Sequence, residues 1–224
     1  MAGPGFHGKI PYHGDFVDRG LAPSFLERWD EWLQLAVASS KEHLGEDWLD
    51  IYLTAPIWQF GVAAGAVDDS SWVGITVPSV DSVGRYFPLT IATKITSQQS
   101  LSDAFFQSTS WFEAIEDIAL AALSEGFDAD TLQQRLGHES LVLCPAEKIP
   151  TASFSPGLRL SAPLLTPQQG PSALLEHYLE QANSGSYSLW RSNGSDNVEP
   201  TIATTAGLPK PEQFSAMLSG KWYE

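Results

Sequence analysis

The chain has 224 residues and a mass of 24.4 kDa, a length typical of one large domain. It carries 12 basic and 27 acidic side chains, which gives a net charge of −15. Nucleic acids and anionic membranes select clustered cations, so this balance argues against both as main partners and favours a protein partner. With 43% apolar and 11% aromatic residues, the composition is that of a globular protein and excludes a disordered one.

Cysteine usage and the N-terminal sequence restrict the chemistry and the compartment. Cys144 is the single cysteine, which excludes an intramolecular disulfide and a cysteine-based zinc knuckle, and we expect neither a metal nor a cofactor. Residues 1–7 lack the cationic and apolar regions of a secretory signal. The uncharged stretch 51–67 is at the short limit for a membrane span and contains Pro56 and Gly61. We therefore predict a cytoplasmic protein with no integral membrane segment.

The first half of the chain predicts an irregular start, two helices and three strands. Residues 1–23 are rich in glycine and proline and show no period, so they are predicted to be irregular. Ser24 and Glu27 form a capping-box pattern, and apolar residues recur at three- and four-residue steps until Gly45, which predicts a long helix. A short helix is expected before Pro56. Runs of β-branched and aromatic residues then predict strands at 57–64, 72–77 and 88–95, joined as an antiparallel meander.

The second half predicts helices around a proline-rich segment. Helices are expected at 101–124 and 131–136, followed by a possible strand at 141–143. Six prolines between 145 and 171 are too many for a central strand or a helix interior, so we predict a surface arm or an internal boundary there. The remaining predicted elements are a helix at 172–182, strands at 187–191 and 201–205, and a helix at 211–218.

Together these elements predict an α/β fold with a single domain over residues 1–224. Its central sheet is expected to be mainly antiparallel, with helices packed on both faces as a three-layer sandwich.

Three catalytic or metal-binding patterns are present only in part. Residues 3–9 match the start of a phosphate-binding loop, but Ile10 replaces the hydroxyl that holds magnesium, and no strand can precede the match. His7, His13 and Asp15 could supply metal ligands, but their spacing fits no compact ligand pattern. A G-x-S-x-G nucleophile elbow is absent from the sequence. These patterns favour ordinary structural roles over nucleotide, metal or nucleophilic chemistry.

Residues 103–130 contain seven acidic side chains and no lysine or arginine. The usual explanation is the solvated face of an amphipathic helix, in which like charges three or four residues apart repel. The functional alternative is a docking face for a basic partner surface, with Glu113, Glu116 and Asp117 at its centre.

Two polar motifs, at residues 8–19 and 78–90, are harder to explain by packing. Arginine and aromatic residues are enriched both in buried ion pairs and at the centres of interfaces, so a structural role and a binding role both remain open. If the motifs bind a partner, Arg85→Ala and Phe87→Ala should abolish capture with an unchanged melting curve; if they are core, both variants should unfold. The residues singled out as motif or binding residues are Lys9, Gly14, Asp15, Phe16, Arg19, Ser79, Asp81, Gly84, Arg85, Tyr86 and Phe87.

Four segments carry a resemblance to a known family. They read G-K-x-P-x-x-G-D-F-V-x-R-x-L at 8–21, W-D-x-W-L at 29–33, Y-L-x-A-P-x-W-x-F at 52–60, and P-S-V-D-x-V-G-R-Y-F-P-L-T at 78–90. In these motifs the chain resembles the type VI secretion system-associated TagF family, also called ImpM. The ending at 207–218 is similar to the tail of that family.

The resemblance implies a cytoplasmic bacterial protein that acts after translation as a negative regulator of a type VI secretion system. It implies that the protein binds and sequesters the forkhead-associated-domain scaffold of that system, and that it is not an enzyme. The alternative from the residues themselves is a hydrolase, or a small-ligand-binding sensor domain, that uses the polar groups of Asp15, Ser79, Asp81 and Arg85.

Overall fold

The computed structural model describes residues 3–97, 99–124, 126–142, 151–154, 157–160, 169–183 and 186–222. Its main element is an open seven-stranded sheet with the order β2-β1-β5-β4-β3-β8-β9, in which every neighbouring pair is antiparallel. The strands of this sheet are β1 Gly5–Gly8, β2 Val17–Arg19, β3 Trp58–Val62, β4 Trp72–Val77, β5 Leu89–Lys94, β8 Tyr187–Ser192 and β9 Thr201–Ala206.

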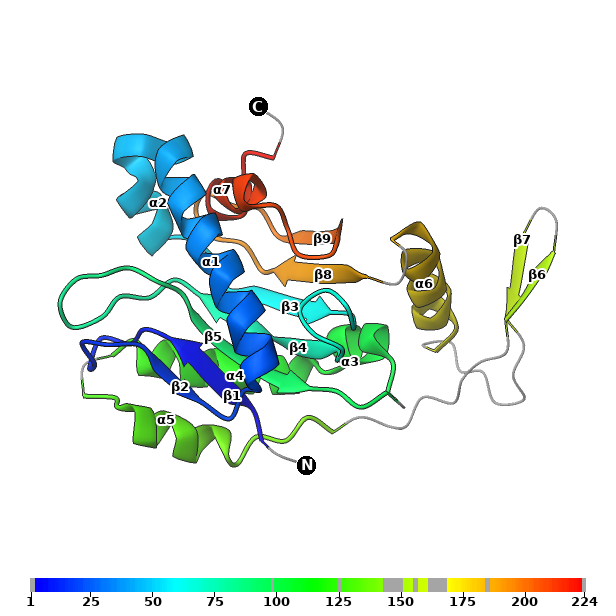
Figure 1. Cartoon of the computed structure of the whole chain (residues 1–224), viewed down its shortest axis with the longest axis horizontal. Helices are drawn as coiled ribbons and strands as arrows, with labels where there is room; N and C mark the ends of the chain where they lie inside the picture. The colour runs from blue at the N-terminus through cyan, green and yellow to red at the C-terminus, as the bar shows by residue number, and fades with distance from the viewer. Residues whose placement is uncertain are drawn as a thin grey trace.

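Helices cover both faces of the sheet (Figure 1). One face carries α1 Pro23–Leu44, α2 Trp48–Leu53 and α7 Pro211–Ser219, with a 3₁₀ turn at Gly45–Asp47 between α1 and α2. The other face carries α3 Leu101–Gln107, α4 Thr109–Ala122 and α5 Ala129–Leu136, and α6 Gln169–Ala182 packs against α3. The arrangement confirms the predicted α/β class, with an antiparallel sheet between two helical layers.

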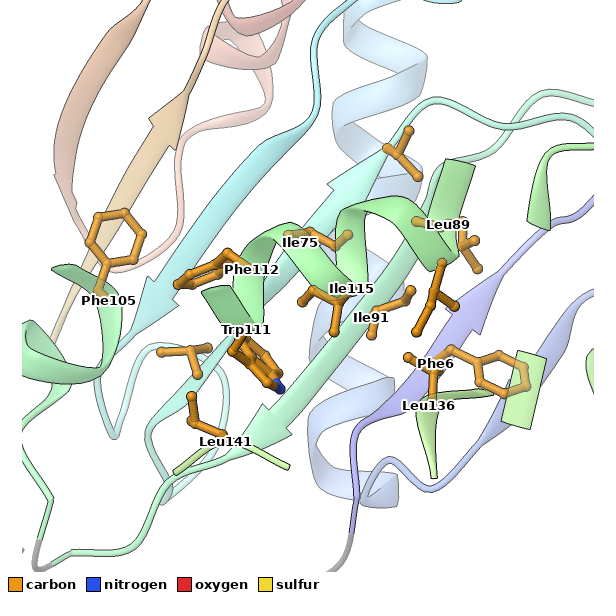
Figure 2. Close-up of a cluster of buried hydrophobic side chains, with 14 of the residues drawn as sticks. Phe6, Ile75, Leu89, Ile91, Phe105, Trp111, Phe112, Ile115, Leu136 and Leu141 are labelled. Atoms are coloured by element: carbon orange, nitrogen blue, oxygen red, sulfur yellow. The ribbon is translucent and has the colours of Figure 1, made fainter. Parts of the chain in front are cut away.

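Each face of the sheet encloses its own hydrophobic core. On the α4 side, Ile75 and Ile91 from neighbouring strands pack against Phe112 and Ile115 (Figure 2). On the α1 side, the core is dominated by tryptophan. Its indole N–H groups are satisfied from distant elements: Trp29 donates to Thr90 Oγ1 at 2.9 Å, Trp32 to Pro209 O at 2.7 Å, and Trp58 to Met217 O at 3.1 Å. A buried tryptophan needs such a partner, so these bonds fix how α1 and α7 lie on the sheet.

The prediction that residues 1–23 are irregular was wrong for β1 and β2. β1 pairs with β2 on one side and with β5 on the other. Its four residues are all buried, so they show no alternation of polar and apolar side chains. The glycines that suggested a loop permit close packing instead: a Cβ at Gly5 would lie 2.6 Å from the carbonyl oxygen of Arg19.

The long first helix begins differently from the prediction. Helix α1 starts at Pro23 after Ala22, and no side chain caps its first turn. The Ser24 hydroxyl donates to Asp68 Oδ2 at 2.8 Å, so Ser24 is committed to a contact far along the chain and the predicted capping box is wrong. Proline is favoured at the first helical position because it has no amide hydrogen to leave unpaired.

The segment 101–124 forms two helices where one was predicted. They meet at Ser108, which has φ −95° and ψ 40° and therefore leaves the helical conformation. A hydroxyl cap starts the first of them: Ser100 Oγ accepts from the backbone N–H of Asp103 at 3.1 Å.

The proline-rich region is described only in part. Leu141 and Val142 are not in a strand, and Leu143 of the predicted strand lies outside the described residues. Within 145–171, β6 Thr151–Phe154 and β7 Gly157–Leu160 pair as a two-stranded antiparallel sheet, separate from the main sheet, and α6 begins at Gln169. The other residues of the predicted arm, and Cys144, lie outside the described residues.

Candidate functional site

The two polar motifs meet at one end of the sheet. The loop 9–16 follows β1, and the loop 78–88 joins β4 to β5. Because β5 is antiparallel to both β1 and β4, the ends of β1 and β4 lie beside the start of β5, and both loops leave the sheet together. We call residues 9–16 and 78–88 the two-loop surface. The sequence identified both segments as special, and the structure joins them into one feature.

Asp81 lies at the centre of the two-loop surface and is almost fully buried. Its Oδ1 accepts from the backbone N–H groups of Val83 at 3.0 Å and of Arg85 at 2.8 Å. Its Oδ2 accepts from Arg85 Nε at 2.7 Å and from the ammonium of Lys9. Burial alone raises the pKa of a carboxyl group, but these donors outweigh it and hold the pKa of Asp81 well below its usual range. Asp81 is therefore an ionised carboxylate that accepts hydrogen bonds from four donors.

Lys9 is buried beside Asp81, with 4% of its surface exposed. A buried ammonium is tolerated when it is paired, and Lys9 has both the carboxylate and the ring of Phe16, whose centroid lies 4.6 Å from Nζ. The backbone of Lys9 is held as well, since Ser79 Oγ donates to its carbonyl oxygen at 2.6 Å. The hydroxyl of Tyr52 in turn bonds both backbone groups of Ser79, and burial raises the pKa of Tyr52.

Arg85 closes the two-loop surface from the outside. Its guanidinium donates to the carbonyl oxygen of Gly14 and lies 3.5 Å from Asp15 Oδ1, while its Nε stays on Asp81. The hydrogen bond to Asp81 raises the pKa of Arg85. Gly84, at φ +83°, supplies the left-handed turn that brings Arg85 back over the loop. Both loops are thus held by charge-assisted bonds that cross between them.

Four exposed side chains lie on the outer side of these two hydrogen-bonded loops. Tyr12 is 55% exposed, Phe16 45% and Val83 68%, and the Arg85 side chain is 56% exposed beside them. Of these four, sequence reasoning selected Phe16 and Arg85. It missed Tyr12 and Val83 because their exposure follows from how the loops fold over the sheet, which no local pattern encodes.

Three other residues singled out by the sequence pack or pair within the fold and are not exposed on the two-loop surface. Phe87 is only 5% exposed and packs edge-on against the rings of His7 and Phe16, so it is not an accessible contact residue. Tyr86 packs against Tyr52 in the α1-side core. Arg19 lies outside the two-loop surface and pairs with Asp130 of α5 at 2.7 Å.

The partial catalytic and metal patterns do not assemble into one site. His7 Nε2 lies 3.0 Å from Asp30 Oδ1, His13 Nε2 accepts from the backbone N–H of Ala129, and Asp15 faces Arg85. Within the described ranges, no group of three potential ligands could hold a metal ion. The lysine of the phosphate-loop match is the buried partner of an aspartate, and the strand β1 occupies the place of the loop.

The residues of the hydrolase alternative are likewise engaged. The Ser79 hydroxyl donates its proton to a backbone carbonyl, and the Asp81 carboxylate accepts from four donors. A cavity of about 540 Å³ lies elsewhere, between the start of α1 and the end of β5, where Leu21, Trp72 and Ile95 are among its lining residues. The lining of this cavity does not include Asp15, Ser79, Asp81 or Arg85.

Two members of the predicted acidic face are exposed on its helix. Glu113 and Asp117 are exposed on α4. Glu116 is half-buried, and its Oε1 accepts from Gln59 Nε2 at 2.6 Å. The Oε1 of Gln59 accepts from Arg191 Nε at 2.7 Å, so Glu116 belongs to an internal polar chain and is not a free docking residue.

Comparison with known proteins defines the class of domain. The family model of the TagF N-terminal domain, described as type VI secretion system-associated, matches residues 5–138. This is more than half of the chain and includes both polar motifs. The chain therefore belongs to the TagF family and is a type VI secretion-associated protein.

The chain is also similar to a protein of known structure. The chain is similar to the crystal structure of PA0076 from Pseudomonas aeruginosa PAO1, with 34% sequence identity and a TM-score of 0.83, over 97% of this chain and 94% of that one. The search of curated proteins found no match. In the described part of the chain, every helix is too short or too polar to span a bilayer.

Proposed function

We propose that this protein is a post-translational negative regulator of a bacterial type VI secretion system. It acts in the cytoplasm, binds the forkhead-associated-domain scaffold of the system and sequesters it from assembly, and it does so by contact without catalysing a reaction. Membership of the TagF family supports a role in type VI secretion. The two-loop surface supports a mechanism of protein binding.

The observation that supports the proposal most directly is that the side chains of Tyr12, Phe16, Val83 and Arg85 are exposed on two loops held together by hydrogen bonds. Aromatic and arginine side chains dominate the energetics of protein interfaces. A partner that binds them does not have to order the loops, because the Asp81 network already holds both loops in place. The buried polar residues of the motifs therefore shape the binding surface, and the exposed aromatic, apolar and arginine side chains make the contacts.

The network also accounts for polar motifs in a protein that acts by binding. Lys9, Ser79 and Asp81 are buried and hydrogen-bond within and between the loops, which is the role expected of polar residues that shape a binding surface. The mechanism we infer is occlusion: the scaffold component bound here is unavailable to the assembling machine. The net charge of −15 favours rapid encounter with a basic partner surface.

The experiment measures secretion by a bacterium with an active type VI system while the protein is overproduced. The wild type should lower secretion, and a Tyr12→Ala, Val83→Asp variant at the same cellular level should not. The control is Tyr178→Ala on α6, a tyrosine that is 60% exposed against 55% for Tyr12. Repression by the double variant equal to that of the wild type would exclude the two-loop surface, and unchanged secretion with the wild type would exclude negative regulation.

A further inference from the structure

The sheet ends in an open strand at β9. β9 is the outermost strand next to β8, and among the residues that the structure describes no strand pairs with its outer side (Figure 1). All six of its residues pair with consecutive residues of β8, so β9 has no bulge. Such an edge offers a row of free N–H and C=O groups to another strand.

Two hydrogen bonds define which backbone groups are free. Gly207 N–H donates to Ser186 O at 3.0 Å, which marks that facing pair as hydrogen-bonded. On the other side of β8, Ala63 N–H donates to Tyr187 O at 2.9 Å, as alternation along the strand requires. Continuing this alternation along β9 gives three residues whose N–H and C=O groups point to the open edge: Ile202, Thr204 and Ala206.

The edge lacks the usual protection against pairing. Exposed edge strands commonly carry charges, proline or a bulge, or are very short. The opposite edge of the sheet follows this rule, because β2 has three residues and contains Asp18 and Arg19. β9 has six residues with neither charge nor proline, and Ile202 is 64% exposed on it.

We propose that β9 pairs in antiparallel fashion with β9 of a second copy of this chain, so that two sheets join across a twofold axis. The free groups determine the register: Thr204 lies on the axis opposite its counterpart, and Ile202 lies opposite Ala206 of the second copy. All three side chains lie on one face of the sheet, which the pairing makes continuous from one copy to the other. This inference is independent of the proposed function.

The charges that flank β9 favour a second copy as the occupant. Glu199 precedes β9 and Lys210 follows it, and both are exposed. Antiparallel pairing brings the segment before β9 in one copy, which contains Glu199, to the same end of the pair as the segment after β9 in the other copy, which contains Lys210, twice by symmetry. The uncharged strand between them lets two molecules of net charge −15 meet along a neutral edge. One strand pair buries little area, so the dimer should be weak, and salt should strengthen it by screening the overall repulsion.

Sedimentation equilibrium of the full chain over a range of concentration and salt tests the proposal. We expect a monomer–dimer equilibrium that shifts toward dimer as salt rises. Ile202→Lys places a charge on the edge and should raise the dissociation constant at least ~10-fold. The control is Leu120→Lys on α4, which is 51% exposed in the wild type and makes the same charge change; it should leave the dissociation constant unchanged.

Amide hydrogen exchange tests the register. On going from dilute to concentrated protein, the amides of Ile202, Thr204 and Ala206 should gain protection, while that of Ala203, which faces β8, should not change. A chain that stays monomeric at every concentration, or a dimer indifferent to Ile202→Lys, would overturn the proposal. Protection of these amides only when another protein is added to a monomeric chain would also overturn it, and would assign the edge to a strand of that protein.

Discussion

The ammonium of Lys9 and the carboxylate of Asp81 form an ion pair in which both side chains are almost completely buried, although 72 positions separate them in the sequence. One residue lies in each loop of the two-loop surface, so the pair holds the loops together. A buried pair contributes little relative to apolar residues of the same shape, but removal of one partner leaves the other charge without compensation.

Replacing Asp81 with asparagine should therefore destabilise the fold strongly. Asparagine keeps an oxygen for the turn N–H groups of Val83 and Arg85 but removes the charge that balances Lys9. We expect a loss of ~3–5 kcal/mol in the free energy of unfolding, measured by denaturant titration. Asp15→Asn is the matched control, because Asp15 is a fully exposed acid beside Arg85, and its unfolding curve should coincide with that of the wild type.

Acid should reduce the difference in the free energy of unfolding between the wild type and the Asp81→Asn variant. The pKa of Asp81 is depressed in the folded state, so its contribution is complete above the unfolded value of 3.8 and is lost as pH falls toward the folded value. The gap in unfolding free energy should therefore be constant from pH 7 to pH 5 and shrink below pH 3.8. A gap that stays constant down to pH 2 would contradict a stabilising carboxylate at this position.

Glu176 should show the opposite pH dependence. It accepts from Ser100 Oγ at 2.6 Å and from the N–H of Leu101 at 3.1 Å, which ties α6 to the start of α3. Burial raises the pKa of Glu176, so the folded state loses stability as pH rises from the unfolded value of 4.5 through the folded one. Glu176→Gln removes this loss and should be more stable than the wild type at pH 7, by under ~1 kcal/mol, and equal to it at pH 4. A variant less stable at pH 7 would show that the charge itself stabilises the contact.

The exposed acids of α4 should affect the rate of association with a basic partner. Glu113→Lys and Asp117→Lys together should slow binding severalfold at low salt and reduce its salt dependence, measured by stopped-flow mixing with the scaffold. Glu116 is left unchanged because its substitution would break the bond to Gln59. An association rate equal to that of the wild type would remove this face from the account.

The sequence predicted the elements whose signals are local, and the site only in outline. The aromatic period of α1 and the β-branched runs of β4 and β5 are local features, so those elements were expected nearly where they occur. β1 was missed because a short strand buried on both faces has no alternation. Lys9 and Asp81 were both singled out, but their pairing depends on β5 lying between β1 and β4, which is a tertiary arrangement.

The same limit explains Phe87 and Tyr12. Both are aromatic residues in polar motifs, and the sequence singled out Phe87 but not Tyr12, with a structural and a binding role both left open for Phe87. The fold buries Phe87 under Phe16 and leaves Tyr12 exposed at the tip of its loop. Side chains in a loop take their burial from what the loop folds against, so that choice required the structure.

Calorimetric titration of the forkhead-associated-domain scaffold into the purified protein tests the central claim most directly. Tyr12→Ala with Val83→Asp should weaken binding by at least ~30-fold, the loss of ~2 kcal/mol expected for contact residues at the centre of an interface, while melting at the wild-type temperature. Tyr178→Ala should bind as the wild type does. Equal affinity of the wild type and the double variant, or no heat of binding with the wild type, would contradict the claim that the protein acts through its two-loop surface.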